Sequence, residues 1–288
     1  SFISKRYQEK RPIIMCIASL IILIFFVPYV ASGLAAIGKL FNSLFGWNYM
    51  LAVIIGALVI ISYTSVGGFS AVATMDLIQS IIMTVALVVI TVFSITQAGG
   101  VDAVVENAKS MDGYLSFFQT YDPVAGSAKP YPAINIFSML AWGLGYFGMP
   151  QVLVRFLSIR SSEEIKKSRI IATTWCVISL ACGVCIGLVG RAMMPTQFAT
   201  QAAAENIFIV VSQALLPSFM CGIVVSGIFA ASMSSSSSYM IIGASAVGEN
   251  IFRGLLHRKA TDRQVMMVAR ITLLVMFIFG IVVAFDQN

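Results

Sequence analysis

Five consecutive serines, at positions 234–238, interrupt an apolar stretch that runs from about residue 219 to residue 248. Lipid offers no water to satisfy five hydroxyl groups, so these side chains are expected to face something polar. On a helix, one narrow face is shared by Ala231, Ser234, Ser235 and Ser238. Such a face predicts contact with a neighbouring helix, a water-filled cavity or a small hard cation, which prefers hydroxyl and carbonyl oxygens. The alternative is tight helix packing through small residues, with hydroxyls bonded to carbonyls one turn earlier.

The composition places the chain in a membrane. Of its 288 residues 59% are hydrophobic and 10% are charged, and the mean hydropathy is +0.93. These values exclude a soluble globular domain and predict an all-α integral membrane protein. Stretches of about 20 apolar residues, enough to cross a bilayer, predict seven spans: 13–44, 49–64, 77–97, 134–156, 170–194, 219–248 and 265–285. The five cysteines fall within these spans and are expected to be apolar packing rather than disulfides or metal ligands.

The positive charges predict an orientation. If Ser1 is cytoplasmic, the inside segments hold all of the 18 Lys and Arg residues except Lys39, Lys109, Lys129 and Arg191. This asymmetry follows the positive-inside rule, and it explains the net charge of +6 without any nucleic-acid partner. The expected location is therefore the plasma membrane, with several crossings. Because the chain opens with Ser1 in a basic segment without a signal peptide, we expect it to be an internal fragment of a single transmembrane core.

Two connections on the outer side are long. Residues 98–132 are expected to form a structured extracellular loop, with a short surface helix over 102–109 capped by Asp102 and turn-forming residues at 122–126. Residues 207–211 are expected to form either an interfacial helix or the start of the next span.

The fourth span is expected to be broken. The segment 142–150 contains Gly143, Gly145, Gly148 and Pro150, which weaken a helix and remove one of its hydrogen bonds. An interrupted helix at membrane depth is tolerated where it lines a cavity, so this segment predicts a binding site. The alternative is that the glycines permit close helix packing while the aromatic residues fill the core or lie at an interface.

Three segments together resemble a known family. Residues 142–156, 67–79 and 227–235 are similar to signature segments of the sodium:solute symporters, and the first is most similar to those of the sodium/proline symporters. The resemblance implies part of a five-plus-five inverted-repeat helix bundle like that of the leucine transporter, here the third to ninth core helices. It also implies a broken substrate-lining helix and sodium-coupled symport of a small organic solute, with L-proline first. Other amino acids, pantothenate-like solutes or sugar acids stay open as alternatives.

The resemblance implies specific sites, with Na⁺ as the coupling ion. Ala231, through its carbonyl, and Ser234 and Ser235, through their hydroxyls, are expected to form one side of a sodium site. A second sodium is implied between Asp76 and the serines at 234, 237 and 238 (Ser234, Ser237 and Ser238). An intramembrane carboxylate supports this hypothesis, but Asp76 could equally cap a helix that begins after Thr74.

The solute site is implied by the same resemblance. Trp142, Tyr146 and Pro150 are expected on one wall and Tyr29 on the opposite wall, whereas Tyr239 is expected to lie beyond the pocket. The chain departs from the sodium/proline pattern at residues 149–151, where Met-Pro-Gln replaces Gln-Pro-His.

Other function classes remain to be weighed against symport. An intramembrane hydrolase would need a base beside a serine, and the single histidine, His257, lies in a basic cytoplasmic segment. Within the predicted spans, the serines have no candidate base other than Asp76. A channel or a membrane sensor with the same fold is a further alternative. We therefore expect a transporter that is not an enzyme and that interacts with lipid, sodium and a small solute.

Overall fold

The computed structural model describes residues 6–8, 13–195, 197 and 204–285. Ser1, on which the predicted orientation depends, lies outside the described residues. The all-α prediction is confirmed apart from one small hairpin, β1 (Gln119–Asp122) with β2 (Ser127–Pro130). The helices are α2 (Ile13–Phe45), α3 (Tyr49–Gln97), α4 (Val101–Ser110), α5 (Ala133–Gly145), η1 (Tyr146–Gly148), α6 (Pro150–Leu157), α7 (Glu164–Met193), α9 (Ile207–Leu215), α10 (Ser218–Ser245), η2 (Ala246–Leu256) and α11 (Asp262–Phe285).

Within the described part of the chain, six helical segments are long and apolar enough to cross a bilayer. One of them, α3, has 49 residues and contains Gly68 in a non-helical conformation with φ 57° and ψ −153°. Only glycine adopts this conformation without strain, so Gly68 divides α3 into two helical stretches. The predicted spans 49–64 and 77–97 lie on opposite sides of this break, and the number of crossings stays a prediction.

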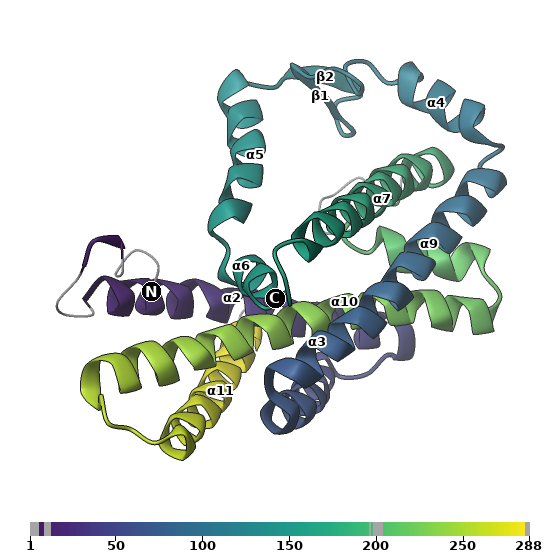
Figure 1. Cartoon of the computed structure of the whole chain (residues 1–288). Helices are drawn as coiled ribbons and strands as arrows, with labels where there is room; N and C mark the ends of the chain where they lie inside the picture. The colour runs from purple at the N-terminus through teal and green to yellow at the C-terminus, as the bar shows by residue number, and fades with distance from the viewer. Residues whose placement is uncertain (1–5, 9–12, 196, 198–203, 286–288) are drawn as a thin grey trace. The chain divides into compact units, whose positions relative to one another are not determined.

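The chain divides into two compact units, and Figure 1 shows the helices of both. Unit 1 contains the residues up to Ile81 and those from Ile228 onward, and unit 2 contains Ile82–Gly227. In unit 1, α11 packs on both α2 and η2. Its core consists of side chains that are almost fully buried, among them Leu34, Ile60, Met240 and Phe277.

Helices α2 and α3 approach closely in unit 1. A Cβ added at Gly38 would lie 2.6 Å from the ring of Tyr49 and 2.7 Å from Val53. The Tyr49 ring is held in place, because its hydroxyl donates a hydrogen bond to the carbonyl of Ala284 on α11 (2.9 Å). Glycine at position 38 is therefore what allows these helices to pack, as is usual for small residues in membrane helices.

In unit 2, α7 contacts both α4 and α9. The indole Nε1 of Trp175 on α7 donates a hydrogen bond to Thr84 Oγ1 on α3 (2.7 Å). Arg191, in the last turn of α7, lies over the ring of Tyr121 on β1 at 5.5 Å. The hairpin is therefore attached to one end of α7 by a cation–π contact.

The connections refine the sequence-based expectations. Helix α4 forms where a surface helix was predicted, but its N-cap residue is Gly100 and no side chain caps it, so the predicted cap by Asp102 is wrong. Asp102 lies instead in the first turn, where a carboxylate is still favourable to the helix dipole. Residues 207–211 belong to α9, which ends before Leu216, so they are not part of α10.

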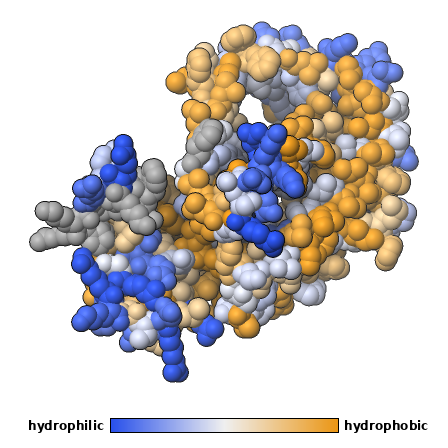
Figure 2. Space-filling model, viewed as in Figure 1, coloured by the Kyte–Doolittle hydropathy of each residue, from blue (hydrophilic) through white to orange (hydrophobic). Residues whose placement is uncertain are grey.

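Much of the surface is hydrophobic (Figure 2). On α7, only Ile186, Val189 and Gly190 are buried, whereas Ile171 and Val184 are 70% and 64% exposed. Hydrophilic residues gather instead near the turn between η2 and α11 and near the start of α7 (Figure 2). This distribution is that of helices whose outer faces are covered by lipid.

Candidate functional site

The serine run lies inside α10, and its hydroxyls point to different partners. Ser234 Oγ donates a hydrogen bond to Asp76 Oδ1 (2.5 Å), and Ser238 Oγ donates one to Asp76 Oδ2 (3.2 Å). These two serines are one turn apart, so they present both hydroxyls to the same carboxylate on α3. A polar partner for this face was predicted from its spacing, and Asp76 is that partner.

The other serines of the run behave differently. Ser237 Oγ bonds to the carbonyl of Ser234 (3.1 Å), and Ser235 is exposed. Ser236 is fully buried against α2, where a Cβ added at Gly33 would lie 2.2 Å from its Oγ. Close helix packing, the alternative considered above, therefore applies to Ser236, and carbonyl bonding applies to Ser237.

Asp76 does not begin a helix. The helical stretch that contains it starts directly after Gly68, about two turns earlier, so its carboxylate is far from the free N–H groups of the first turn. The helix-cap interpretation is therefore wrong. What remains is a half-buried carboxylate in an apolar helix, accepting hydrogen bonds from two hydroxyls of α10.

Ala231, the third member of the predicted sodium site, is half-buried on α10, as is Ser234. Together with the exposed Ser235 they lie in the middle of this helix. No group of three or more His, Cys, Asp or Glu that could hold a metal occurs among the residues described. A cation at this place would therefore depend on uncharged oxygens and on Asp76, which suits sodium rather than a transition metal.

The predicted break in the fourth span is confirmed. Helix α5 ends at Gly145, a short 3₁₀ turn follows over Tyr146–Gly148, and α6 begins at Pro150. Proline disfavours the helical conformation of the residue before it, and Met149 is accordingly extended at ψ 116°. The rings of Trp142 and Tyr146 meet edge to face with centroids 5.0 Å apart, and both are exposed.

The other residues named for the solute site lie in two units. Pro150 is half-buried in unit 2 beside the buried Gln151, whose Nε2 donates to Met149 Sδ (3.6 Å). Tyr29 belongs to unit 1, so a pocket that joins it to Trp142 stays a prediction. Tyr29 stacks on Tyr239 with centroids 4.8 Å apart. Tyr239, which was expected to lie beyond the pocket, is therefore in contact with one of the residues predicted to line it.

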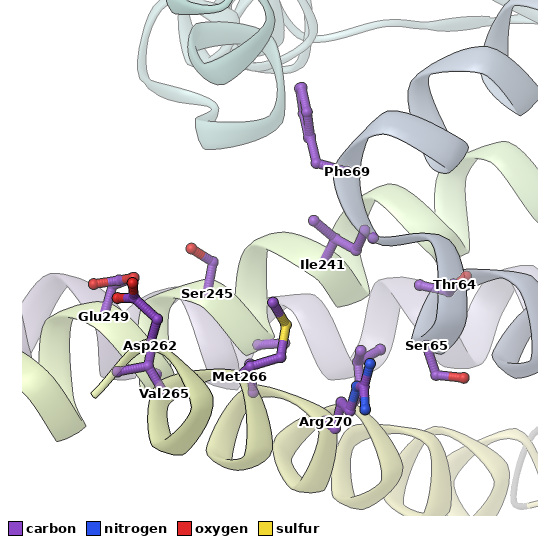
Figure 3. Close-up of a pocket in the computed structure, with 15 residues that line it drawn as sticks. Thr64, Ser65, Phe69, Ile241, Ser245, Glu249, Asp262, Val265, Met266 and Arg270 are labelled. Carbon is purple, nitrogen blue, oxygen red and sulfur yellow. The ribbon is translucent and has the colours of Figure 1, made fainter. Parts of the chain in front are cut away.

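A cavity of about 340 Å³ was not predicted. It lies within unit 1 between the break in α3, the end of α10, η2 and α11. In Figure 3, Glu249 and Asp262 lie side by side at one end, and Thr64 and Ser65 lie at the other. Arg253 forms ion pairs with Glu249 (3.3 Å) and with Asp262, so its single positive charge is shared between the two carboxylates at this end.

Sequence comparison identifies relatives along the whole chain. The family model for the sodium:solute symporter family matches residues 1–288. The osmoregulated proline transporter OpuE of Bacillus subtilis is 35% identical over 287 residues, which is 100% of this chain and 56% of that protein. The high-affinity proline transporter PutP of the same organism is 33% identical and is covered to 59%. The chain thus spans somewhat more than half the length of these relatives.

Structure comparison gives the same fold. A solved structure described as the substrate-bound outward-open state of a Na⁺-coupled sialic acid symporter matches with a TM-score of 0.77 and 20% identity, covering 98% of this chain and 60% of that one. The predicted transporter architecture is therefore confirmed at the level of fold, and the relatives are transporters rather than enzymes. With its full length matched by the family model, the chain belongs to the sodium:solute symporter family.

Proposed function

We propose that the protein containing this chain couples the entry of sodium to the uptake of a small organic solute. The observation that carries the proposal is the contact between Asp76 on α3 and two hydroxyls of α10. A carboxylate inside an apolar helix is costly and usually marks an ion or proton pathway. Its hydroxyl partners supply the uncharged oxygens that a sodium ion needs.

We propose two sodium positions, as the resemblance to the family implies. One uses the carbonyl of Ala231 with Ser234 and Ser235, and the other uses Asp76 with Ser234, Ser237 and Ser238. The hydroxyl of Ser234 belongs to both, because a serine oxygen can donate to a carboxylate while its lone pairs face a cation. Occupation of one site would therefore influence the other through Ser234.

The driving force is the sodium gradient together with the membrane potential. Inward movement of one positive charge contributes about 2.3 kcal/mol per 100 mV. Sodium bound from outside would hold α3 and α10 together, and rocking of one helix group against the other would then expose ion and solute to the inside. No covalent step is required.

L-proline is the first candidate solute, because the relatives are proline transporters. In the proposed site, Trp142 and Tyr146 offer aromatic faces to a small apolar ring. The broken helix at residues 146–149 leaves backbone groups available to the carboxylate and amine of an amino acid. The replacement of Gln-Pro-His by Met149-Pro150-Gln151 changes the polar groups nearby, so other amino acids, pantothenate and sugar acids belong in the same test.

The test is uptake by the full-length protein in proteoliposomes with an imposed inward sodium gradient. A panel of labelled solutes should give saturable proline uptake that disappears when potassium replaces sodium on both sides. Empty liposomes provide the control. Uptake that does not saturate would indicate a channel, whereas solute binding without uptake would indicate a sensor, and either result would reject symport.

A further inference from the structure

Next to the carboxylate site, unit 1 contains a second set of polar side chains, here called the polar cluster: Tyr63, Thr64, Gln79 and Ser237. Thr64 and Ser237 are each 1% exposed and Gln79 is 7% exposed. The phenol of Tyr63 lies beside the side chains of the other three and within electrostatic reach of Asp76. These residues come from both stretches of α3 and from α10, and the fold brings them together at one place.

Two oxygens of this cluster, Thr64 Oγ1 and Gln79 Oε1, have no hydrogen-bond partner among the residues that the structure describes. Gln79 Oε1 is buried and accepts no hydrogen bond from any residue that the structure describes. Leaving a buried amide oxygen unpaired is unfavourable, because its lost contact with water is not replaced, and nearly all buried polar groups in native proteins avoid this cost. In a helix surrounded by lipid the cost is not relieved by bulk water. A cation or a water molecule bound to Gln79 Oε1 would remove this cost.

Gln79 is placed to share a cation with Asp76. The two residues are three positions apart on the same helical stretch of α3, so their side chains lie on one face. Asp76 faces Ser234 and Ser238 across the interface with α10. Ser237, which also neighbours Tyr63, bonds to the carbonyl of Ser234 and belongs to the same turn.

We propose that Gln79 is a further ligand residue of the cation site at Asp76, with Oε1 as the ligand atom. Tyr63 is a positioning residue, because its hydroxyl donates to the carbonyl of Met233 (3.3 Å) and so fixes the turn of α10 that carries Ser234. This inference rests on the proposed sodium coupling and adds a residue that the serine and aspartate sites do not include.

The charge of the completed site favours a monovalent ion. Asp76 supplies one negative charge, while Gln79, Ser234 and Ser238 supply neutral oxygens. Calcium sites usually gather several carboxylates, and magnesium keeps most of its water. One carboxylate with three uncharged oxygens therefore matches Na⁺ in charge as well as in ligand type.

The direct test is Gln79→Leu in the full-length protein, with Gln97→Leu as the control. Gln97 lies at the exposed end of the same helix and undergoes the same chemical change. Binding of ²²Na⁺ to purified protein should weaken about ten- to a hundredfold in Gln79→Leu, as expected for the loss of one ligand to a charged group. Gln97→Leu should bind as the wild type does.

A second variant separates a ligand from a packing role. Gln79→Glu keeps an oxygen at the same place and adds a second carboxylate, which favours divalent ions. If Gln79 contacts the ion, Ca²⁺ should compete with ²²Na⁺ at least tenfold more strongly in Gln79→Glu than in the wild type. A residue that only packs would leave this competition unchanged, and this readout remains useful if Gln79→Leu does not fold.

Tyr63→Phe tests the positioning role, and Tyr49→Phe is its matched control. Each change removes a tyrosine hydroxyl that donates a hydrogen bond to a backbone carbonyl of another helix in unit 1, and each keeps the ring. Only Tyr63→Phe should raise the sodium concentration for half-maximal uptake, by about threefold or more, with the maximal rate retained. A lower rate at unchanged sodium dependence in both variants would indicate a structural role alone.

The outcomes distinguish this inference from the proposed function. If wild-type protein binds ²²Na⁺ and shows sodium-driven uptake while Gln79→Leu equals Gln97→Leu in sodium affinity, the inference is wrong and symport stands. If the wild type transports solute without sodium, the proposed function itself is wrong. Wild-type calcium competition in Gln79→Glu would also overturn the ligand assignment.

Discussion

At the scale of single residues, the surroundings of the Asp76 carboxylate explain why serines face it from α10. Its carboxylate is half-buried in an apolar helix, and the 2.5 Å contact with Ser234 is as short as hydroxyl–carboxylate hydrogen bonds usually are. Two hydroxyl donors offset part of the cost of removing a carboxylate from water, but they do not neutralise its charge. A bound cation would do so.

The first prediction is therefore that Asp76→Asn weakens sodium coupling. The amide keeps the size of the side chain and can still bond to Ser234 and Ser238, while the charge is lost. Apparent sodium affinity in uptake assays should fall at least tenfold, or about 1.4 kcal/mol, with normal amounts of protein in the membrane. Unchanged sodium dependence in this variant would reject Asp76 as an ion ligand.

The second prediction concerns the solute. If Tyr146 bonds to a charged group of the solute, Tyr146→Phe removes about 1.5–3 kcal/mol, so the solute concentration for half-maximal uptake should rise roughly ten- to a hundredfold. Tyr131→Phe, in the connection between β2 and α5, is the control. Tyr239 is unsuitable as a control because its ring stacks on Tyr29. Wild-type solute affinity in Tyr146→Phe would exclude this hydroxyl from the site.

At the scale of elements, close packing fixes how α2 and α3 meet. The third prediction is that Gly38→Ala destabilises the protein, since the new methyl group would overlap the Tyr49 ring and Val53. Overpacking of this kind costs about 1–3 kcal/mol. Thermal unfolding in detergent should show a clearly lower midpoint than for Gly143→Ala, where an added Cβ meets no atom within 4 Å. Equal midpoints would mean that the helices separate without cost.

The stability of the β1–β2 hairpin is expected to depend on pH through Asp122. The ammonium of Lys129, followed by the N–H groups of Val124 and Ala125, lowers the pKa of Asp122 to about 2. A carboxyl with a lowered folded-state pKa stabilises the fold above its unfolded value, near 3.9, and this contribution is lost as the pH falls through the folded value.

The fourth prediction follows from that sign. The protection from hydrogen exchange that Asp122 gives to the hairpin should be constant from neutral pH down to about pH 4. It should disappear between about pH 4 and pH 2. Hydrogen exchange of a peptide covering residues 119–130 measures it, with Asp122→Asn compared at each pH to remove other effects of acid. The difference between the two proteins should vanish at the lowest pH. A difference that persists there would contradict the ion pair.

At the scale of the whole molecule, hydropathy and local breakers predicted most of the fold. The apolar stretches located the helices, and Pro150 located the break before α6, because both effects are local in the sequence. The start of the helix that contains Asp76 was missed, since it depends on the conformation of one glycine, Gly68, which the sequence does not distinguish from Gly67. The hairpin was missed because its strands have only four residues each.

The site was predicted less completely than the fold. The spacing within one helix identified Ser234 and Ser238 as facing a polar partner, and the family resemblance supplied Asp76. The contacts of Tyr63, Ser236 and Tyr239 depend on how α2, α3 and α10 are rotated about their axes. Helical periodicity gives which residues share a face, but it does not give which helix that face meets.

The last prediction concerns how α3 lies in the membrane. A straight helix of 49 residues would be about 70 Å long, more than twice the hydrocarbon thickness of about 30 Å. The break at Gly68 instead allows two crossings, and we therefore expect both ends of α3 on one side. The positive-inside rule predicts that both ends of α3 face the outside. It predicts that the connection between α6 and α7 faces the inside, because Arg160 lies in it and Lys166 and Lys167 lie at the start of α7.

Single cysteines test this arrangement in full-length protein whose native cysteines, including the five of this chain, have been replaced. Ser43→Cys before α3, Ala125→Cys in the hairpin turn and Ser162→Cys before α7 are all at exposed positions. A membrane-impermeant thiol reagent should label the first two on intact cells and the third only after permeabilisation. Labelling of Ser43→Cys and Ala125→Cys from opposite sides would mean that α3 crosses once. Labelling of Ser162→Cys alone on intact cells would reverse the orientation, because the number of crossings between these positions would be unchanged while every loop changed sides.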